Sequence, residues 1–501
     1  MTTYLGIDTS TTATKALLID ADGNVLGIGR SEYDYATPMP GWSEQDPDLW
    51  WNGTIDAIRE ATRLSGVDPS TVAAVGITGQ MHGLVALDAN DRPIRPSILW
   101  NDQRTATQCD EIRERVGRDR LIAVTGNDAL TGFTAPKILW MRDEEPENYA
   151  RISTILLPKD YVRLRLTGVR AVDRAGASGT LLFDLEQRDW SDEVIESLGL
   201  QRDWFPSTFE GTDVTGHITD EAASLTGLKP GTPVIGGAGD QAANGVGTGA
   251  VEPGTVAVSL GTSGVVFAAT DRPVVDADAR LHSFCHAVPG LWHQMGVMLS
   301  AAGSLRWFRD TVAPDASFAD LSSEAGTVAP GSDGLLFLPY LTGERTPYPD
   351  PEARGAFVGL TVRHTRAHLT RAVMEGVAFG LRDSLEIIRE QSEVREIRVA
   401  GGGAASPEWL QILADVFGAE VCTVDVPESA AFGVALLAAV AAGEYPTAGD
   451  AVDATIRTGK TYLPGSDTNG YQDAYDIYRS LYPTLRETSY RLGHLEMIST
   501  R

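Results

Sequence analysis

A glycine-rich turn that ends in a carboxylate constrains the fold of this chain more than any other segment. Residues 233–235 form a short apolar run that predicts a buried strand. Gly236, Gly237 and Gly239 follow, and glycines let a backbone adopt positive φ and approach a ligand closely. Asp240 then begins a predicted helix, whose dipole should keep the acid ionised. This order indicates an α/β fold in which Asp240 is a candidate general base.

Strand and helix patterns divide the chain into two related halves. The first half predicts strands over 4–8, 15–19, 25–28 and 72–78 and a helix over 46–64. The second predicts strands over 255–260, 265–269 and 396–399 and helices over 368–390 and from Pro407 onward. We therefore expect mixed sheets flanked by helices, in a domain over 1–247 and a second over 248–501 with a C-terminal helical extension. Turns from both halves would meet a ligand between them.

Small residues follow apolar strands at residues 9–12, 261–264 and 401–406. Turns of this kind present backbone N–H groups that bind phosphate without a basic surface, although most Gly/Ser/Thr turns only reverse the chain. Thr11 and Thr262 add hydroxyl groups. Asp8 precedes the first turn, where it could either cap the turn or hold Mg²⁺ through water.

Two polar segments are candidates for a carbohydrate site. Gly79-Gln80-Met81-His82-Gly83 follows a predicted strand, where α/β proteins usually bind ligands, although a loop histidine is more often a packing residue. Residues 100–104 place Asp102 beside a tryptophan, which suits a sugar or, equally, a capped helix with a packed indole. Residues 344–347 could orient a ligand but fit a salt-bridged turn better.

Composition limits the partners. The chain has 501 residues and a net charge of −27, from 41 basic and 68 acidic residues. This charge argues against nucleic acid or an anionic membrane as a general partner. The cysteines show no metal-ligand spacing, and neither a signal peptide nor a long enough apolar stretch is visible, so we expect a cytoplasmic protein. Scarce lysine suggests either a salt-rich habitat or an arginine-biased genome.

Several motifs together resemble the FGGY carbohydrate kinases and, within them, the xylulokinases. The resemblance runs from about Tyr4 to the 440s. Its markers are residues 6–8 with Lys15, and residues 42–47, 79–83, 98–102, 133–137, 157–161, 239–240, 259–264, 282–286 and 343–347.

The resemblance implies two actin-like (ribonuclease-H-like) domains with the active site in the interdomain cleft, and transfer of phosphate from MgATP to D-xylulose. It implies that Asp240 is the catalytic base and that Asp8 supports the metal and phosphates. The residues implied to contact sugar or nucleotide are Met81, His82 and Gln241 for the sugar, Thr262 for the phosphates, Gly402, Gly403 and Ser406 for the adenosine, and Trp307 at the nucleotide's border. A homodimer is among the expected assemblies. Gln241 is a departure, since many relatives carry asparagine after the acid.

Three alternatives remain open at this point. An actin-like or chaperone-like ATPase would use the same phosphate turns without a sugar. A sugar-sensing regulator would have lost catalysis, although both acids are retained. A kinase could also act on another ketose or polyol, such as ribulose or a sugar alcohol, because fold alone does not decide the substrate.

Overall fold

The computed structural model describes residues 2–465 and 468–499, which form two compact units. The first unit consists of Met1–Glu252, Ala269–His293 and Val426–Ile456. The second consists of Pro253–Ala268, Gln294–Asp425 and Arg457–Arg501. Each unit is thus discontinuous along the chain, whereas the sequence patterns suggested two continuous ranges.

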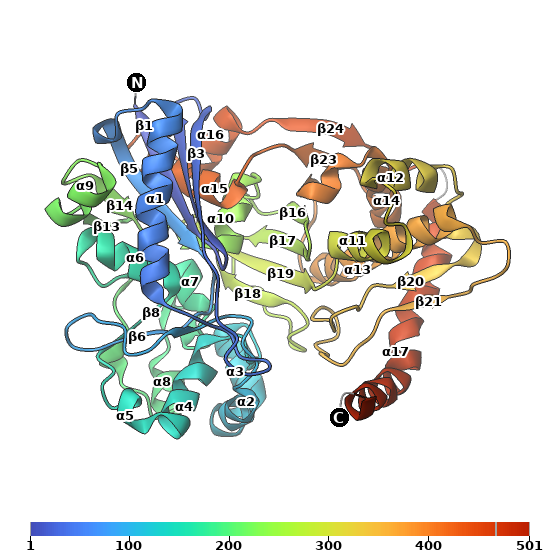
Figure 1. Ribbon diagram of the computed structural model, residues 1–501, viewed down its shortest axis with the longest axis horizontal. Helices are drawn as coiled ribbons and strands as arrows, with labels where there is room; N and C mark the ends of the chain where they lie inside the picture. Colours follow the sequence, from blue (N-terminus) through green and yellow to red (C-terminus); the bar gives the residue numbers. More distant parts are fainter. Residues whose placement is uncertain (1, 466–467, 500–501) are drawn as a thin grey trace. The chain divides into compact units, whose positions relative to one another are not determined.

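The first unit is built on a mixed sheet in the order β13-β14-β5-β1-β2-β3 (Figure 1). Its strands are β13 (Val214–His217), β14 (Pro233–Ile235), β5 (Val72–Gly79), β1 (Thr3–Thr9), β2 (Ala13–Asp20) and β3 (Val25–Glu32), with β15 (Ala238–Gly239) also paired to β5. β1, β2 and β3 form the predicted antiparallel meander, while β1, β14 and β15 each pair with β5 in parallel.

Two helices cover this sheet. α1 (Pro47–Ser65) packs on β2 and β3, and begins where the Asp46 side chain accepts a hydrogen bond from the Asp48 N–H. α15 (Ser429–Ala441) consists mostly of apolar residues, and it packs on β1 and β5. A Cβ at Gly6 would lie 1.9 Å from the Ala431 carbonyl oxygen, so this strand must carry glycine for α15 to approach.

The first unit also contains shorter helices and strands. The helices are α2 (Ala106–Ile112), α3 (Arg118–Thr125), α4 (Thr134–Glu144), α5 (Pro146–Tyr149), α6 (Pro158–Thr167), α7 (Arg174–Ser178), α8 (Asp192–Ser197), α9 (Asp220–Thr226), α10 (Asp240–Gly247) and α16 (Ala448–Thr455). The short strands are β4 (Glu44–Gln45), β6 (Val85–Leu87), β7 (Ser97–Ile98), β8 (Thr154–Leu156), β9 (Val172–Asp173), β10 (Phe183–Asp184), β11 (Asp189–Trp190), β12 (Thr208–Phe209) and β18 (His282–Cys285).

The second unit has a mixed sheet of similar design, with strands in the order β19-β17-β16-β22-β23-β24. They are β19 (Trp292–Met298), β17 (Gly264–Thr270), β16 (Thr255–Leu260), β22 (Glu396–Ala400), β23 (Val421–Val424) and β24 (Thr458–Tyr462). As in the first unit, a strand in an antiparallel hairpin, here β16, also pairs in parallel with a later strand, here β22. The other elements are α11 (Ala302–Val312), α12 (Phe318–Gly326), β20 (Leu336–Leu338), β21 (Ala356–Val358), α13 (Arg366–Gln391), α14 (Pro407–Phe417) and α17 (Thr468–Ser499).

α17 presents a row of tyrosines to the second unit. Tyr471, Tyr475, Tyr478 and Tyr482 recur at helical spacing and are all buried. The hydroxyl groups of three of them donate to buried carboxylates at 2.6–2.7 Å: Tyr471 to Glu375, Tyr475 to Asp383 and Tyr482 to Asp350. The helix is therefore an integral part of this unit.

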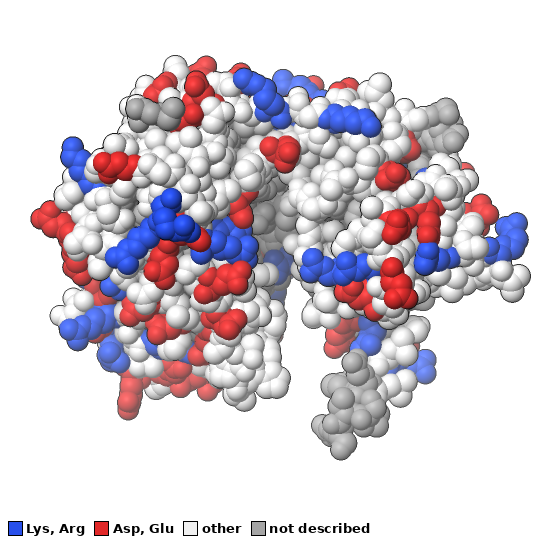
Figure 2. Space-filling model, turned by 45° about the horizontal axis from the view of Figure 1, so that its top comes forward, with Lys and Arg blue, Asp and Glu red and all other residues white. Residues whose placement is uncertain are grey.

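Charge is mixed over the surface. Figure 2 shows Asp and Glu side chains interspersed with Lys and Arg on one face. Within residues 2–465 and 468–499, the structure has no helix long and apolar enough to cross a membrane. Cys109, Cys285 and Cys422, all of which are described, are buried and free.

Candidate active site

Three parallel strands of the first unit end at one edge of its sheet and bring the predicted polar residues together. Asp8 of β1 lies opposite Thr78 of β5, and Ala238 of β15 lies opposite the same threonine. Asp240 follows β15 directly. The two acids, far apart in the sequence, are close enough for the Asp8 charge to affect the titration of Asp240.

Asp240 lies where ionisation is opposed. It keeps part of its surface accessible, but burial and then the nearby Asp8 carboxylate raise the pKa of Asp240 to about 7. The Gln241 N–H donates to its Oδ1 at 2.8 Å and acts in the opposite direction. Desolvation and the like charge of Asp8 thus act against the helix dipole that was expected to keep this acid ionised. A carboxylate with a pKa near neutrality suits a general base.

Asp8 has an oxygen that lacks a protein partner. Among the described residues, nothing hydrogen-bonds to its buried Oδ1, or to the buried hydroxyl groups of Thr9 and Thr78. The structure also arranges no group of three or more His, Cys, Asp or Glu side chains for a metal within its described part. Unpaired oxygens suit Mg²⁺ that takes its other ligands from water and phosphate, so the residues present fit the ion.

Lys15 and Glu428 form an ion pair beside Asp8. Lys15 lies opposite Asp8 in the β1–β2 register, and its Nζ is 2.5 Å from Glu428 Oε2. Burial raises the pKa of Asp8 to about 6, Lys15 lowers it and Glu428 raises it again. The carboxyl of Asp8 is thus held between two opposing charges.

His82 is fixed in an unusual backbone conformation. Its φ of 68° is uncommon for a residue with a side chain. Lys137 Nζ and Thr134 Oγ1 both donate to its carbonyl oxygen, at 2.9 and 3.1 Å. Its ring Nδ1 lies 2.6 Å from the Gly179 carbonyl oxygen. These contacts fix both the backbone and the ring of His82.

Met81 packs directly against the turn that carries Asp240. A Cβ at Gly239 would lie 2.7 Å from Met81 Cγ, so the glycine before the acid makes room for this side chain. Gln241, the first residue after the acid, is partly exposed. The structure therefore brings Met81, Asp240 and Gln241 to one place.

Thr11 joins the first phosphate-type turn to both polar segments. The Trp100 Nε1–H donates to Thr11 Oγ1 at 3.0 Å, and this hydroxyl donates to Gln80 Oε1 at 3.2 Å. The Gln45 side-chain amide donates to the Thr11 carbonyl oxygen at 2.9 Å. The turn is thus held by Gln80, which directly precedes Met81, and by Trp100 and Gln45.

Asp102 has a structural environment. It is fully buried, and its carboxylate accepts hydrogen bonds from the Ser43 N–H and from the backbone and guanidinium of Arg104. Arg104 in turn lies over the Trp42 ring, with its Cζ 3.6 Å from the ring centroid. These partners support the structural alternative for Asp102 over a role in binding sugar.

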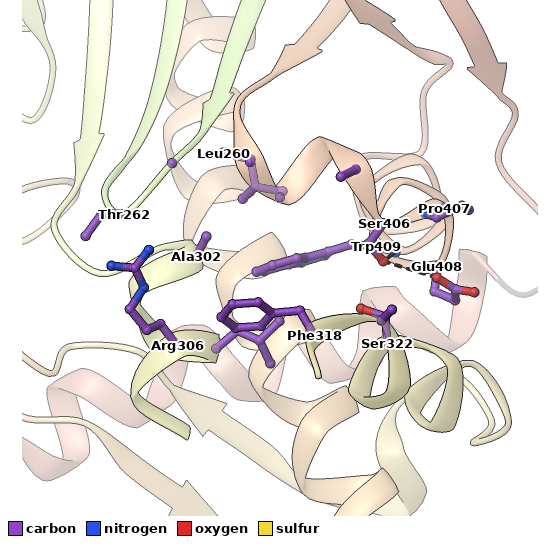
Figure 3. A pocket seen from close by; sticks show the side chains of 16 residues that line it. Leu260, Thr262, Ala302, Arg306, Phe318, Ser322, Ser406, Pro407, Glu408 and Trp409 are labelled. Atoms are coloured by element: carbon purple, nitrogen blue, oxygen red, sulfur yellow. Dashed lines mark hydrogen bonds between the residues drawn. The ribbon is translucent and has the colours of Figure 1, made fainter. Parts of the chain in front are cut away.

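The second unit contains a cavity of about 830 Å³, which is a usual size for a ligand pocket. Thr262, Gly402, Gly403 and Ser406 line it, as do residues of α11, α12 and α14. In Figure 3, the Trp409 ring lies between Leu260 and Phe318, and the Arg306 side chain points toward Thr262. A Cβ at Gly402 would meet nothing within 4 Å, so the backbone there is open to the cavity.

The turn at residues 261–264 is held from below by the start of α11. The N–H groups of Ala301 and Ala302 donate to the carbonyl oxygens of Thr262 and Gly261, at 2.9 and 2.8 Å.

Glu344 contacts the chain just before α11. Its carboxylate accepts hydrogen bonds from the Leu299 N–H at 2.9 Å and from the Arg345 N–H at 2.7 Å. Burial raises the pKa of Glu344 to about 8. Both of these donors are backbone groups, and the neighbouring Arg345 charge acts against the rise in the Glu344 pKa.

Two family models match most of the chain. The N-terminal domain of the FGGY family of carbohydrate kinases matches residues 3–247, and the C-terminal domain matches residues 256–442. The chain belongs to this family.

Known FGGY proteins resemble the chain over nearly its whole length. A xylulose kinase of Lactococcus lactis is 39% identical, with 98% of this chain and 99% of that protein covered. The structure of the xylulose kinase from Rhodospirillum rubrum is 31% identical and has a TM-score of 0.91, with coverage of 97% and 100%. A gluconate kinase from Lactobacillus acidophilus is 27% identical with a TM-score of 0.93, and coverage of 98% and 99%. The predicted α/β class with two mixed-sheet domains is confirmed.

Some lining residues were not singled out in the FGGY sequence motifs. Arg306, Phe318 and Trp409 line the cavity. Of these three, only Trp409 lies beside a predicted feature, the start of the helix at Pro407. Trp409 is buried, with its Nε1–H bound to the Met374 carbonyl oxygen. Trp307 is not among the lining residues that the structure describes, and it stacks on Phe337 with ring centroids 6.1 Å apart.

Proposed function

We propose that this FGGY kinase is a xylulose kinase, which transfers the γ-phosphoryl group of ATP to the C5 hydroxyl of D-xylulose. The observation that carries the proposal is the partly accessible Asp240, with a pKa of about 7, on a turn whose Gly239 lies against Met81 of the Gln-Met-His segment. The full-length likeness to xylulose kinases supports the choice of sugar.

Asp240 orients the sugar hydroxyl and accepts its proton as the new P–O bond forms. Met81 and His82 contact the ketopentose, and Gln241 offers its amide to another hydroxyl. The rigid support of His82 by Lys137 and Thr134 holds the sugar in one orientation. Mg²⁺, when bound near Asp8 through water, neutralises charge on the phosphates.

The cavity of the second unit binds the nucleotide. Gly402 lets the backbone approach the adenosine, Gly403 beside it packs closely against the Leu260 side chain, and the Ser406 hydroxyl lies in the same lining. Thr262 is exposed on a turn whose N–H groups can bind phosphate. Leu260, Phe318 and Trp409 give the cavity apolar walls that suit a purine.

A coupled ADP-release assay tests the proposal. MgATP is offered with D-xylulose, D- and L-ribulose, pentitols, glycerol, gluconate or no sugar. Strong stimulation by D-xylulose is expected. Gluconate belongs in the panel because a gluconate kinase shares the fold with a TM-score of 0.93. Stimulation by another compound instead would show that D-xylulose is not the substrate. Fast turnover without any sugar would favour an ATPase.

Asp240→Asn is the matching variant. Because proton transfer by a positioned base is typically worth ~10²–10⁴ in rate, kcat should fall by about that factor while ADP binding by calorimetry is retained. Asp119→Asn is the control, since that carboxylate is fully exposed. Normal turnover in Asp240→Asn would remove the residue from this role.

We also propose that the enzyme works in the cytoplasm, where ATP is available, and that it forms a homodimer. Free buried cysteines are compatible with a reducing compartment. Light scattering after gel filtration distinguishes a dimer from a monomer.

A further inference from the structure

Four ionisable side chains are buried together in the first unit, away from solvent. Lys159, Asp160 and Arg163 lie on α6, and Asp173 ends β9. None of the four side chains has exposed surface. Ion pairs link Lys159 to both aspartates and Arg163 to Asp160, so this set, the Lys159 cluster, is neutral overall. Buried ion pairs often stabilise a fold no better than apolar residues would, so the cluster calls for another explanation.

One arm of the cluster reaches the turn before Asp240. The Arg163 guanidinium donates to the carbonyl oxygens of Gly236 and Ala171. Gly237, the next residue along the turn, has φ of 63°, and a Cβ there would lie 1.8 Å from the Ile77 carbonyl oxygen. The turn therefore has little freedom, and Arg163 fixes its first carbonyl group.

The other arm reaches the segment that holds His82. Lys159 pairs with Asp173, whose Oδ1 accepts a hydrogen bond from the Gly176 N–H at 2.7 Å and so caps α7. α7 ends just before Gly179, whose carbonyl oxygen lies 2.6 Å from His82 Nδ1. The same cluster thus supports the partner of the His82 ring.

We infer that Arg163 and Lys159 are positioning residues for the phosphoryl transfer. Through the Lys159 cluster, they fix the position of the Asp240 turn relative to Gly179, whose carbonyl oxygen contacts the His82 ring. Neither residue touches the substrate. Ion pairs and hydrogen bonds have preferred directions, so they fix the positions of these backbone segments. Apolar side chains of the same volume would allow the segments to shift. The inference rests on the proposed function of Asp240 and His82.

Arg163→Met tests the inference, because it keeps an unbranched apolar side chain, removes the donors and leaves Asp160 paired with Lys159. We expect kcat with the sugar to fall about 10²-fold, since a displacement near 1 Å can cost that much. ADP binding by calorimetry should be unchanged. Arg165→Met on the same helix is the control, because Arg165 is partly exposed and pairs with Asp48. A folded Arg163→Met enzyme with wild-type kcat and KM would overturn the inference.

Arg163→Lys covers the case in which the methionine variant does not fold. It keeps the charge and the pairing with Asp160 but replaces by a single nitrogen the two guanidinium nitrogens that donate to Ala171 and Gly236, so kcat should fall about 10-fold with little change in Tm. Wild-type kcat in this variant would also overturn the inference. Kinetics use whichever sugar stimulates the wild-type enzyme most, so a different substrate leaves the test intact. A wild-type protein without sugar-dependent turnover would instead contradict the proposed function.

Discussion

At the scale of single residues, Asp240 and Asp8 share surroundings that oppose the ionisation of both. Burial is the largest cause for each, and the Asp8 charge adds to it at Asp240. The neighbouring cation Lys15 favours the ionised form of Asp8. We therefore infer different roles for the two acids. Asp8 ionises first and attracts the metal, while Asp240 is the acid whose proton is exchanged near neutral pH.

The kinetic prediction from this pair concerns pH. kcat/KM reports the ionisation of the free enzyme, and Asp240 must be ionised to accept a proton. We expect kcat/KM for the sugar to rise with pH through about 7 and to level off above that value. Initial rates between pH 5.5 and 9, in buffers of constant ionic strength, measure the profile. A flat profile would show that another group accepts the proton.

The raised pKa of Asp240 should also appear in stability. Because this pKa is higher in the folded protein than in the unfolded chain, the folded state loses stability as pH rises from about 4 through about 7. Asp240→Asn removes the loss, and each tenfold difference in proton affinity between the two states is worth ~1.4 kcal/mol. The variant should therefore melt about 5 °C higher than wild type at pH 8 and at the same temperature near pH 4. Equal melting at pH 8 would contradict the raised pKa.

Sequence reasoning reached Asp240 because glycines around an acid are a local signal, but it could not give the acid's ionisation. That property depends on Asp8, more than two hundred residues away, and on burial. Asp102 illustrates the opposite case. Its polar neighbours suggested a ligand, yet Arg104 and the Ser43 N–H occupy its carboxylate.

At the scale of elements, α17 stabilises the second unit through phenol–carboxylate hydrogen bonds. We predict that Tyr475→Phe lowers the free energy of unfolding by ~1.5–3 kcal/mol at pH 8, the usual value of a hydrogen bond to a charged group. The partner Asp383 has a pKa raised to about 6 by burial, so it is ionised at that pH and would lose its donor. Thermal melting followed by circular dichroism measures the change.

Ile477→Ala on the same helix is the control, because that side chain is exposed and should change the melting temperature little. Lowering the pH to 5 should narrow the gap between Tyr475→Phe and wild type, since Asp383 is then largely protonated. A gap that is the same at both pH values would show that the phenol acts through packing alone.

Helix starts were predictable because they depend on a few neighbouring residues. Asp46 with Pro47 and Ser406 with Pro407 define the starts of α1 and α14, and both the Asp46 and Ser406 side chains cap these helices. Packing partners were not predictable in this way. Nothing near Gly6 in the sequence shows that α15 will lie against it.

At the scale of the whole molecule, a net charge of −27 implies self-repulsion that salt can screen. The Debye length falls from ~10 Å at 0.1 M to ~3 Å at 1 M. We predict that the melting temperature rises between 0.05 and 1 M KCl and that activity persists at the higher concentration.

Sorbitol at matched osmolarity separates screening from solute exclusion, and NaCl in place of KCl tests for a specific ion. If melting temperature and activity are equal at low and molar salt, the scarcity of lysine reflects codon bias and has no connection with a saline habitat.

The order of segments within each unit has a consequence for synthesis. β1, β2 and β5 emerge from the ribosome early, yet α15, which covers β1 and β5, comes from Val426–Ile456 near the other end of the chain. At roughly 5–20 residues per second, the apolar face of these strands waits about 20–70 s for its cover. During that interval the nascent chain is a natural client for chaperones, and a transcript truncated before residue 426 would yield a product that cannot bury this surface.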